Sequence, residues 1–311
     1  MGSYFIGEDI KDPYGGAFKV TKGFSSLNNK LVKSTPISES AIVGVGIGLS
    51  LMGNKPFIEI MFGDFVTHIF DQLISNASKF FHMYSFKASC PVRIRTPMGG
   101  KRGYGPTHSQ SLEKFFLGID NLVVVALTSL EEPSEIISEL QKLDCPAIII
   151  ENKTDYGKTL FQTNEFLKID KIGHPFGSIH AYPIEGEPDI TIISYGGTAR
   201  EIVDASLEIY LETEILIETF CLTSLNPLRI DPLLDSIKSS KGLLVVEDHS
   251  VDFGLGSEIL AKLSELNIAK PCKRLGARPV PIPSVKELEE KVLPTKDVII
   301  DVLKEFYRGI K

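Results

Sequence analysis

The amino-acid sequence predicts an α/β protein of two domains, each a mainly parallel sheet flanked by helices. The chain has 311 residues, which is more than one domain usually needs and enough for two hydrophobic cores. Short apolar runs typical of buried strands alternate with segments of helical periodicity in both halves, as parallel sheets require. A stretch rich in Gly, Pro, Lys and polar residues separates the halves. We therefore expect domains at 1–165 and 189–311, joined by a connector at 166–188.

The first half alternates strands with helices. Residues 67–84 carry apolar side chains at helical intervals, among them Ile69, Leu73 and Ala77, and predict one long helix. The expected elements, in order, are a strand at 4–6, a helix after Ser38, a strand at 55–61, the helix at 67–84, strands at 92–95 and 122–126, a helix at 131–143 and a strand at 147–150.

The second half repeats the alternation and predicts a second, smaller α/β domain. The proline-rich segment 279–283 is expected to be stiff and extended, because each proline ring fixes a backbone angle. The expected elements are strands at 190–194, 214–219 and 242–247, with helices at 198–211, 232–239, 256–266 and 297–307.

The composition indicates a globular protein, with 43% hydrophobic and 23% charged residues. A net charge of -7 and the lack of any Lys/Arg-rich run argue against a nucleic-acid partner. No signal peptide is visible, and no apolar run reaches the ~18 residues of a membrane helix. The four cysteines are scattered without C-x-x-C spacing. This pattern favours reduced thiols in the cytoplasm over a disulfide framework or a zinc site.

Residues 34–48 combine one acidic residue with an apolar, small-residue segment. Ser38 is placed to cap a helix, and Glu39 then lies in its first turn. From the spacing alone, Glu39 either complements the helix dipole, which is the commoner case, or exchanges a proton with a bound heterocycle from an apolar pocket. Gly44, Gly46 and Gly48 leave room for close approach by another backbone or subunit.

Several motifs occur in a fixed order along the chain. They are Thr35–Glu39, Gly53–Pro56, Glu59–Phe65, Phe70–Gln72 and His108–Ser111. From about Phe5 to the C-terminus the chain resembles the beta subunits of thiamine-diphosphate-dependent 2-oxoacid dehydrogenases, the pyruvate and branched-chain group of the transketolase-like superfamily. The resemblance implies a pyrimidine-binding domain followed by a transketolase C-terminal-like domain.

The resemblance also implies roles for particular side chains. Glu39 matches the glutamate that hydrogen-bonds the aminopyrimidine ring of thiamine diphosphate, a task that needs a protonatable, partly desolvated carboxylate. Phe65 falls where the family stacks an aromatic ring on the pyrimidine. Met61 and Ile37 are expected to line the same pocket, although each would suit an ordinary core. His108 matches a histidine that faces the substrate and acts in proton transfer or reductive acylation of a lipoyl group.

Other polar residues near these motifs are expected to be structural. Asp64 and Asp71 are expected to cap or pair within a helix start, and His68 to lie on a helix surface or in a core rather than in the cleft. His249 is expected to shape a helix start in the second domain and to serve subunit contact. Thr107 holds the place where many relatives have a second histidine, a departure that concerns acyl transfer rather than cofactor binding.

The metal half of a thiamine site has no counterpart in the sequence. The chain lacks the Gly-Asp-Gly motif that holds magnesium and the diphosphate. The resemblance therefore implies an alpha subunit that supplies Mg²⁺, an α2β2 assembly, and a lipoyl transacylase as a further partner. Some relatives hold a structural potassium near the strand that follows Pro146, but Leu143 and Cys145 occupy positions where polar ligands are common, which argues against potassium here.

Three functions remain open from the sequence. The leading hypothesis is a beta subunit that helps to decarboxylate a 2-oxoacid and to pass the acyl group to lipoamide. A split transketolase-like or carboligating enzyme acting on sugars or aldehydes would share both domains. A non-catalytic assembly partner is the third possibility, and the retained Glu39 and Phe65 argue against it.

Overall fold

The computed structural model describes residues 3–173 and 175–310. The first sheet has seven strands in the order β11-β5-β6-β4-β3-β1-β2. Six of them come from the first half of the chain: β1 (Phe5–Gly7), β2 (Val32–Ser34), β3 (Phe57–Glu59), β4 (Arg93–Met98), β5 (Val123–Ala126) and β6 (Ala147–Asn152). These six pair in parallel, so their carboxyl ends meet at one edge of the sheet.

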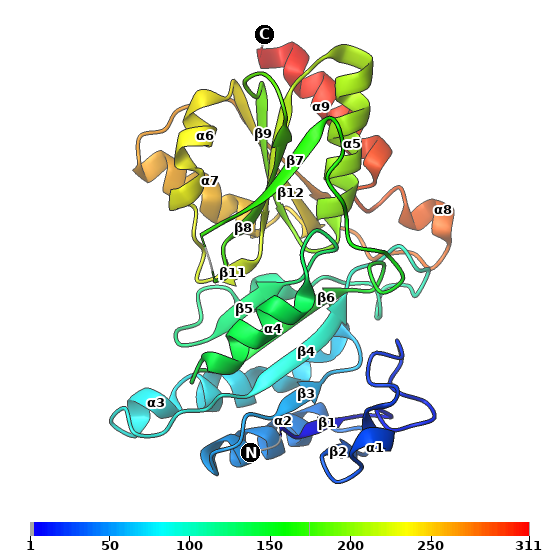
Figure 1. The fold of residues 1–311 in the computed structure, drawn as a ribbon, viewed down its shortest axis with the longest axis vertical. Helices are drawn as coiled ribbons and strands as arrows, with labels where there is room; N and C mark the ends of the chain where they lie inside the picture. Colours follow the sequence, from blue (N-terminus) through cyan, green and yellow to red (C-terminus); the bar gives the residue numbers. More distant parts are fainter. Residues whose placement is uncertain (1–2, 174, 311) are drawn as a thin grey trace.

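Helical segments cover both faces of the first sheet (Figure 1). Their bounds are α1 (Phe24–Leu27), α2 (Glu39–Leu51), the 3₁₀ helix η1 (Gly63–Ile69), the π-helix η2 (Gln72–Ala77), α3 (Phe80–Met83), the 3₁₀ helix η3 (Glu113–Phe116) and α4 (Pro133–Lys142). The buried side of α2 packs into the same cluster as Ile58 of β3, whereas α4 packs on the other face with Val125 of β5. The strand–helix alternation predicted for this half is present.

The long helix predicted for residues 67–84 is wrong in its detail. The segment divides into η1, η2 and α3, and the amide of Ser78 bonds the carbonyl of Leu73 five residues back. Ile69, Leu73 and Ala77 are nevertheless buried, as their spacing predicted. Apolar spacing selects the side that faces the core, and it does not decide which carbonyl each amide bonds.

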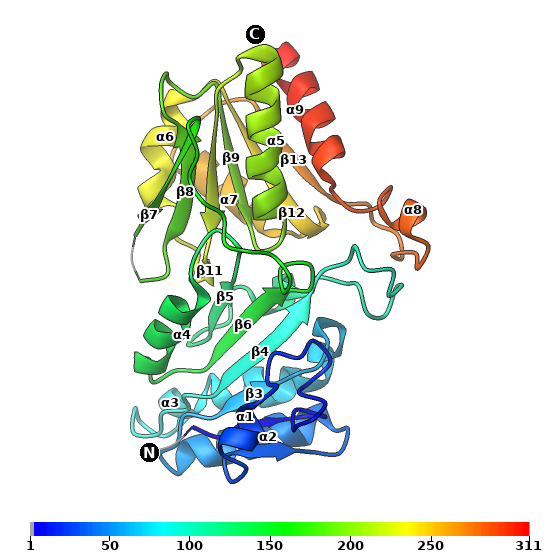
Figure 2. The same ribbon diagram turned by 45° about the vertical axis from the view of Figure 1, so that its right-hand side comes forward.

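The second sheet has six strands in the order β13-β12-β9-β10-β8-β7. The strands are β7 (Leu167–Ile172), β8 (Ser178–Pro183), β9 (Ile190–Tyr195), β10 (Ile217–Leu222), β12 (Gly242–Ser250) and β13 (Cys272–Ala277). Figure 2 shows α5 (Thr198–Thr213) beside α9 (Lys296–Ile310) on one face, with α6 (Leu234–Ser239) and α7 (Leu255–Glu265) on the other. The short η4 (Asp231–Leu233) and α8 (Lys286–Glu289) complete this half.

The two halves are joined by more than the chain connection. The segment expected as a connector contains β7 and β8, which form an antiparallel edge of the second sheet. The strand β11 (Ser224–Asn226) leaves the second half and pairs antiparallel with β5, so that Ser224 lies opposite Val125. Strand β13 was not predicted, because its side chains are mostly half-exposed at a sheet edge and include Lys273 and Arg274. In the described residues no helix is long and apolar enough to span a bilayer.

Candidate active site

The residues predicted for the site follow the carboxyl ends of neighbouring parallel strands. The turn after β1 contains Glu8, and the loop after β2 leads to Glu39 at the start of α2. Phe65 lies in η1 after β3, and His108 lies in the loop after β4. Ser40, next to Glu39, donates its hydroxyl to the carbonyl of His68 at 2.6 Å, which ties the start of α2 to η1. The topology therefore gathers these segments at one edge of the sheet.

His108 is held in a group of aromatic rings. Its ring lies edge-on to Phe62, with centroids 4.8 Å apart, and edge-on to Phe65 at 5.3 Å. Phe62 also contacts Phe65 at 5.9 Å, so the three rings form one cluster. The hydroxyl of Thr107 lies 3.0 Å from Nδ1 of His108. Aromatic faces with one imidazole suit a flat heterocycle and a proton-transfer step beside it.

Two buried charged residues fix the loop that contains His108. Lys153, directly after β6, donates Nζ to the carbonyls of Gly99 and His108 at 2.8 and 2.6 Å. Burial lowers the pKa of Lys153 to about 8. Asp64 accepts hydrogen bonds from the amide and the side chain of Gln110 at 3.2 and 2.9 Å. Asp64 lies in the first turn of η1, as expected, but its carboxylate does not cap that turn and bonds the loop instead.

Glu39 lies in the first turn of α2 and is half-buried. Ser38 occupies the N-cap position as predicted, but its side chain forms no capping hydrogen bond. Glu8 is buried near Glu39, and its Oε1 has no hydrogen-bond partner in the described residues. Burial, followed by the charge of Glu39, raises the pKa of Glu8. The start of α2 thus brings together two carboxylates of different exposure.

Sequence reasoning missed Glu8 and Lys153 as members of the site. A signal existed for both, since each follows the carboxyl end of an expected strand, the place where parallel sheets collect functional side chains. Their chemistry depends on burial, which the sequence did not reveal.

The remaining predicted pocket residues differ in exposure. Met61 is half-buried just after β3, whereas the side chain of Ile37 is 81% exposed. The loop that precedes α2 is therefore exposed at Ile37. His68 is exposed on η1, in agreement with the expected position on a helix surface.

His249 is buried within this chain, whereas Phe253 of the same turn is 93% exposed, so a role of the turn in subunit contact stays a prediction. Nε2 of His249 lies 3.6 Å from Oε1 of Glu113 in the first half and 3.4 Å from Oε2 of Glu247. Tyr195 donates its hydroxyl to Oε1 of Glu113 at 2.7 Å. Glu247 accepts the amide of Gly256 at 3.1 Å, so this segment does shape the start of α7 as predicted. The group joins the two halves.

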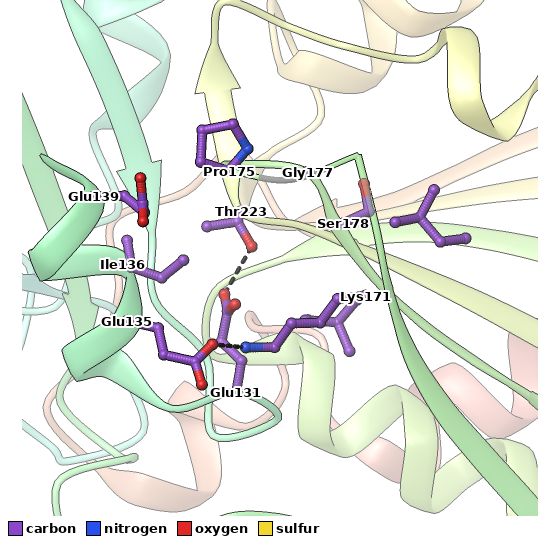
Figure 3. A pocket seen from close by; sticks show the side chains of 11 residues that line it. Glu131, Glu135, Ile136, Glu139, Lys171, Pro175, Gly177, Ser178 and Thr223 are labelled. Atoms are coloured by element: carbon purple, nitrogen blue, oxygen red, sulfur yellow. Dashed lines mark hydrogen bonds and ion pairs between the residues drawn. The ribbon is translucent and has the colours of Figure 1, made fainter. Parts of the chain in front are cut away.

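A separate pocket lies between α4 and the second sheet, away from the predicted site (Figure 3). Glu131 points toward Thr223, which donates its hydroxyl at 2.7 Å, and Glu135 pairs with Lys171. Burial raises the pKa of Glu131. Both acids are engaged with residues of the second half, so they join the two halves.

The residues at the sheet edge fit one half of thiamine diphosphate. A half-buried carboxylate at a helix start and an aromatic cluster suit its flat pyrimidine ring. Across residues 3–173 and 175–310, no group of three or more His, Cys, Asp or Glu side chains is arranged to hold a metal ion. The described residues therefore provide no metal cluster to pair with the pyrimidine side.

Comparisons with known proteins identify the two halves of the chain as known domains. Residues 4–159 match the transketolase pyrimidine-binding domain, and residues 180–299 match the transketolase C-terminal domain. A solved split-gene transketolase, described as an inactive beta4 tetramer, has a TM-score of 0.73 and 20% identity, covering 99% of this chain and 93% of its own. This likeness concerns the fold.

Curated relatives share nearly the whole chain. The mitochondrial pyruvate dehydrogenase E1 component subunit beta of Chaetomium thermophilum is 30% identical over 98% of this chain and 80% of its own length. That of Leifsonia xyli is 31% identical over 96% and 87%. The acetoin:2,6-dichlorophenolindophenol oxidoreductase subunit beta of Cupriavidus necator is 29% identical over 98% and 92%. The chain thus belongs to the transketolase-like family of thiamine-diphosphate proteins, in the group that contains the pyruvate dehydrogenase E1 beta subunits.

Proposed function

We propose that this chain is the beta subunit of an enzyme that decarboxylates a 2-oxoacid and transfers the acyl group to lipoamide, with the active site completed by an alpha subunit. The observation that supports the proposal is the contact between the rings of Phe65 and His108, in segments that, like the one leading to Glu39, follow the carboxyl ends of strands in one parallel sheet. The names of the relatives from Chaetomium and Leifsonia support the 2-oxoacid class.

In this proposal Glu39 holds and exchanges a proton with the far ring nitrogen of the aminopyrimidine. Phe65 supports the ring, while Met61 and Ile37 line its surroundings. When bound, thiamine diphosphate supplies the carbon that attacks the oxoacid and the electron sink for loss of carbon dioxide. Glu8 keeps a second carboxyl close to Glu39, where its charge acts on the same proton equilibrium.

His108 is proposed to move a proton at the substrate or during acyl transfer. The edge contacts with Phe62 and Phe65 restrict its ring, and Thr107 fixes Nδ1. In this proposal Nε2 is the ring nitrogen that gives a proton to the reacting group or takes one from it. Lys153 and Asp64 position the loop without touching the substrate in this proposal.

An alpha subunit is proposed to bring Mg²⁺ and the donors for the diphosphate. The absence of a Gly-Asp-Gly motif supports this division, and so does the exposure of Ile37 in the loop that precedes α2. We further propose an α2β2 assembly, a lipoyl transacylase as its acceptor and a cytoplasmic location.

Co-expression with an alpha subunit of the same enzyme group tests the proposal. The purified complex should release carbon dioxide from at least one member of a panel of 2-oxoacids, with thiamine diphosphate and magnesium present. Glu39→Gln in the same complex should retain assembly and lose this activity, with exchange of the thiazolium proton slowed by orders of magnitude, because an amide cannot supply the proton. A complex that assembles and decarboxylates no 2-oxoacid contradicts the proposed reaction.

The Cupriavidus relative favours a second candidate. Its name concerns acetoin, a hydroxyketone rather than an oxoacid, and Thr107 in place of a second histidine suits a reaction without reductive acylation of lipoamide. Acetoin with an artificial electron acceptor therefore belongs in the same screen. If the complex turns over acetoin and no 2-oxoacid, the proposed substrate changes to a hydroxyketone, as in a carboligating enzyme. The proposed cofactor stays the same.

A further inference from the structure

Arg93, the first residue of β4, is a buried arginine whose hydrogen bonds end on main-chain carbonyl oxygens. Its exposure is 0%. Nη1 donates to the carbonyl of Cys145 at 2.6 Å and to that of Val92 at 3.4 Å. Nη2 donates to the carbonyls of Leu140 and Leu143, the latter at 2.6 Å. A buried charge is usually paired with an opposite charge, so a cation surrounded by carbonyls needs its own explanation.

The carbonyls come from the end of one helix and the loop after it. Leu140 lies in the last turn of α4, Leu143 is its C-cap, and Cys145 precedes β6. The last carbonyls of a helix lack partners within the helix and carry the negative end of its dipole. Converging carbonyl oxygens are also the groups that replace the water shell of a monovalent metal ion.

A second cation, Lys55, bonds main-chain carbonyls at the end of α4. Lys55 donates Nζ to the carbonyls of Gln141 and Leu143 at 2.8 and 3.2 Å and pairs with Asp144. Its side chain is 32% exposed, so it contacts water as well. The end of α4 thus receives one buried and one half-exposed cation, both from the strand side of the domain.

Arg93 keeps its charge in this position at neutral pH. Burial lowers the pKa of its guanidinium to about 10, which still lies well above neutrality. The oxygen positions that a potassium ion would use beside Leu143 and Cys145 are engaged by Nη1 and Nη2. The residues present therefore do not fit a metal ion at this place.

We propose that the Arg93 guanidinium is a built-in cation that fills a cage of main-chain carbonyls and fixes the end of α4 to β4 without a metal ion. The cage is defined by the carbonyls of Leu140, Leu143 and Cys145. It lies at the amino-terminal end of β4, and the loop with His108 leaves the opposite end. The inference is independent of the proposed function.

Thermal unfolding of the full chain tests the cage in two salts. Potassium chloride and choline chloride at equal ionic strength separate a specific ion effect from screening. Wild type should have the same Tm in both, because the guanidinium occupies the cage. A higher Tm of wild type in potassium alone would overturn the inference, since a metal ion would then bind there as well.

Replacement of the side chain separates charge from volume. Arg93→Met fills similar space without charge and should lower Tm by roughly 5 °C or more, because the carbonyls of Leu140, Leu143 and Cys145 lose the hydrogen bonds that Arg93 donates. Arg93→Lys retains the charge, and its Tm should lie between those of Arg93→Met and wild type. If Arg93→Met is as stable as Arg93→Lys, the side chain serves only to fill space and the inference fails.

Arg93→Ala opens the cage and should create a site for a small cation. Its Tm should be higher in potassium chloride than in choline chloride, whereas the control Arg200→Met, which removes an arginine paired with Asp204 on α5, should show no such difference. A folded Arg93→Ala without any potassium effect would contradict the cage. If Arg93→Ala fails to fold, the Tm values of Arg93→Lys and Arg93→Met decide the question. A higher Tm for Arg93→Lys supports the cage, and equal Tm values mean that the side chain only fills space.

Discussion

His108 lies edge-on against Phe62, with the two ring centroids 4.8 Å apart and the ring planes at 81°. This arrangement directs the positive edge of one ring at the face of the other, so the imidazole is restrained by packing as well as by its loop. Phe62 follows β3 and His108 follows β4, two neighbours in the sheet. The contact therefore joins the cofactor side of the proposed site to its substrate side.

His108→Ala is expected to spare cofactor binding and to lower turnover by roughly 100-fold or more, the scale of a lost general acid or base. Glu39 and Phe65 remain to bind the pyrimidine in this variant. Cofactor affinity, decarboxylation with an artificial electron acceptor and lipoyl acylation should be measured separately in the reconstituted enzyme. Loss of the last step alone places His108 in acyl transfer, and loss of both reactions places it at decarboxylation.

The exposed His68 supplies the control for this experiment. His68→Ala removes an imidazole from η1 and should leave all three measurements unchanged. Thr107→Val should have a smaller effect than His108→Ala, because Thr107 acts only through its contact with Nδ1. Unchanged rates in His108→Ala would assign His108 no role in the reaction.

Lys153→Met is expected to loosen the loop that contains His108. The change removes the donor to the carbonyls of Gly99 and His108, at a cost of about 1–3 kcal/mol for the oxygens left without a partner. Amide exchange in residues 99–110 should become faster, and turnover should fall about tenfold to a hundredfold. The control Lys158→Met removes a lysine of the same loop region that pairs with Asp155, and residues 99–110 should keep their exchange rates. Normal exchange in Lys153→Met would refute the anchoring role.

Glu8 is expected to make stability fall as pH rises. Burial and the charge of Glu39 raise the pKa of Glu8 above its value of 4.5 in an unfolded chain. Between these two pKa values the folded protein holds a proton that the unfolded chain has released, so the free energy of unfolding decreases with rising pH. Glu8→Gln removes the ionisation and should raise Tm at pH 7 more than at pH 4.

Unfolding of Glu8→Gln, wild type and the exposed control Glu187→Gln should be followed from about pH 4 to pH 8. The Glu187 variant should parallel wild type. A Glu8→Gln variant that is less stable than wild type at pH 7 would mean that the ionised carboxylate is stabilised in the fold.

The alternation of strands and helices was largely predictable because it depends on residue patterns along the chain, whereas the order of the strands in each sheet was not predicted. Alternation of apolar runs with helical spacing located β3, β4, β6 and the main helices, and ordered motifs located Glu39 and His108. The segment 67–84 shows the limit of the pattern, since its buried stripe is correct and its single α-helix is not.

The supports of the site were not predictable from local patterns. Asp64 and Gln110 are separated by 46 positions, and Lys153 and His108 by 45 positions. Each pair depends on parallel strands that place distant loops at one edge, and Lys153 bonds main-chain groups that leave no trace in residue type. The contacts of Arg93 could not be predicted for the same reason, because its partners are main-chain carbonyls at the end of a helix.

Two glycines of α2 provide a matched test of assembly. A Cβ at Gly46 would lie 2.7 Å from Cδ1 of Ile58, whereas a Cβ at Gly44 would meet no atom of the described chain within 4 Å. Gly46→Ala should therefore destabilise the chain by about 1–3 kcal/mol through overpacking. Gly44→Ala should stabilise it by about 1 kcal/mol, since alanine favours the helix.

We expect the alpha subunit to cover the face of α2 that contains Gly44, where Val45 is 56% exposed and Met52 is 77% exposed. Gly44→Leu should then leave the isolated chain at least as stable as wild type, since leucine also favours the helix, and weaken its assembly with the alpha subunit, because the added side chain keeps the two surfaces apart. Analytical ultracentrifugation of the co-expressed chains measures the effect. Full assembly of Gly44→Leu would show that this face of α2 lies outside the subunit interface, and the partner would then have to complete the site from the side of Ile37.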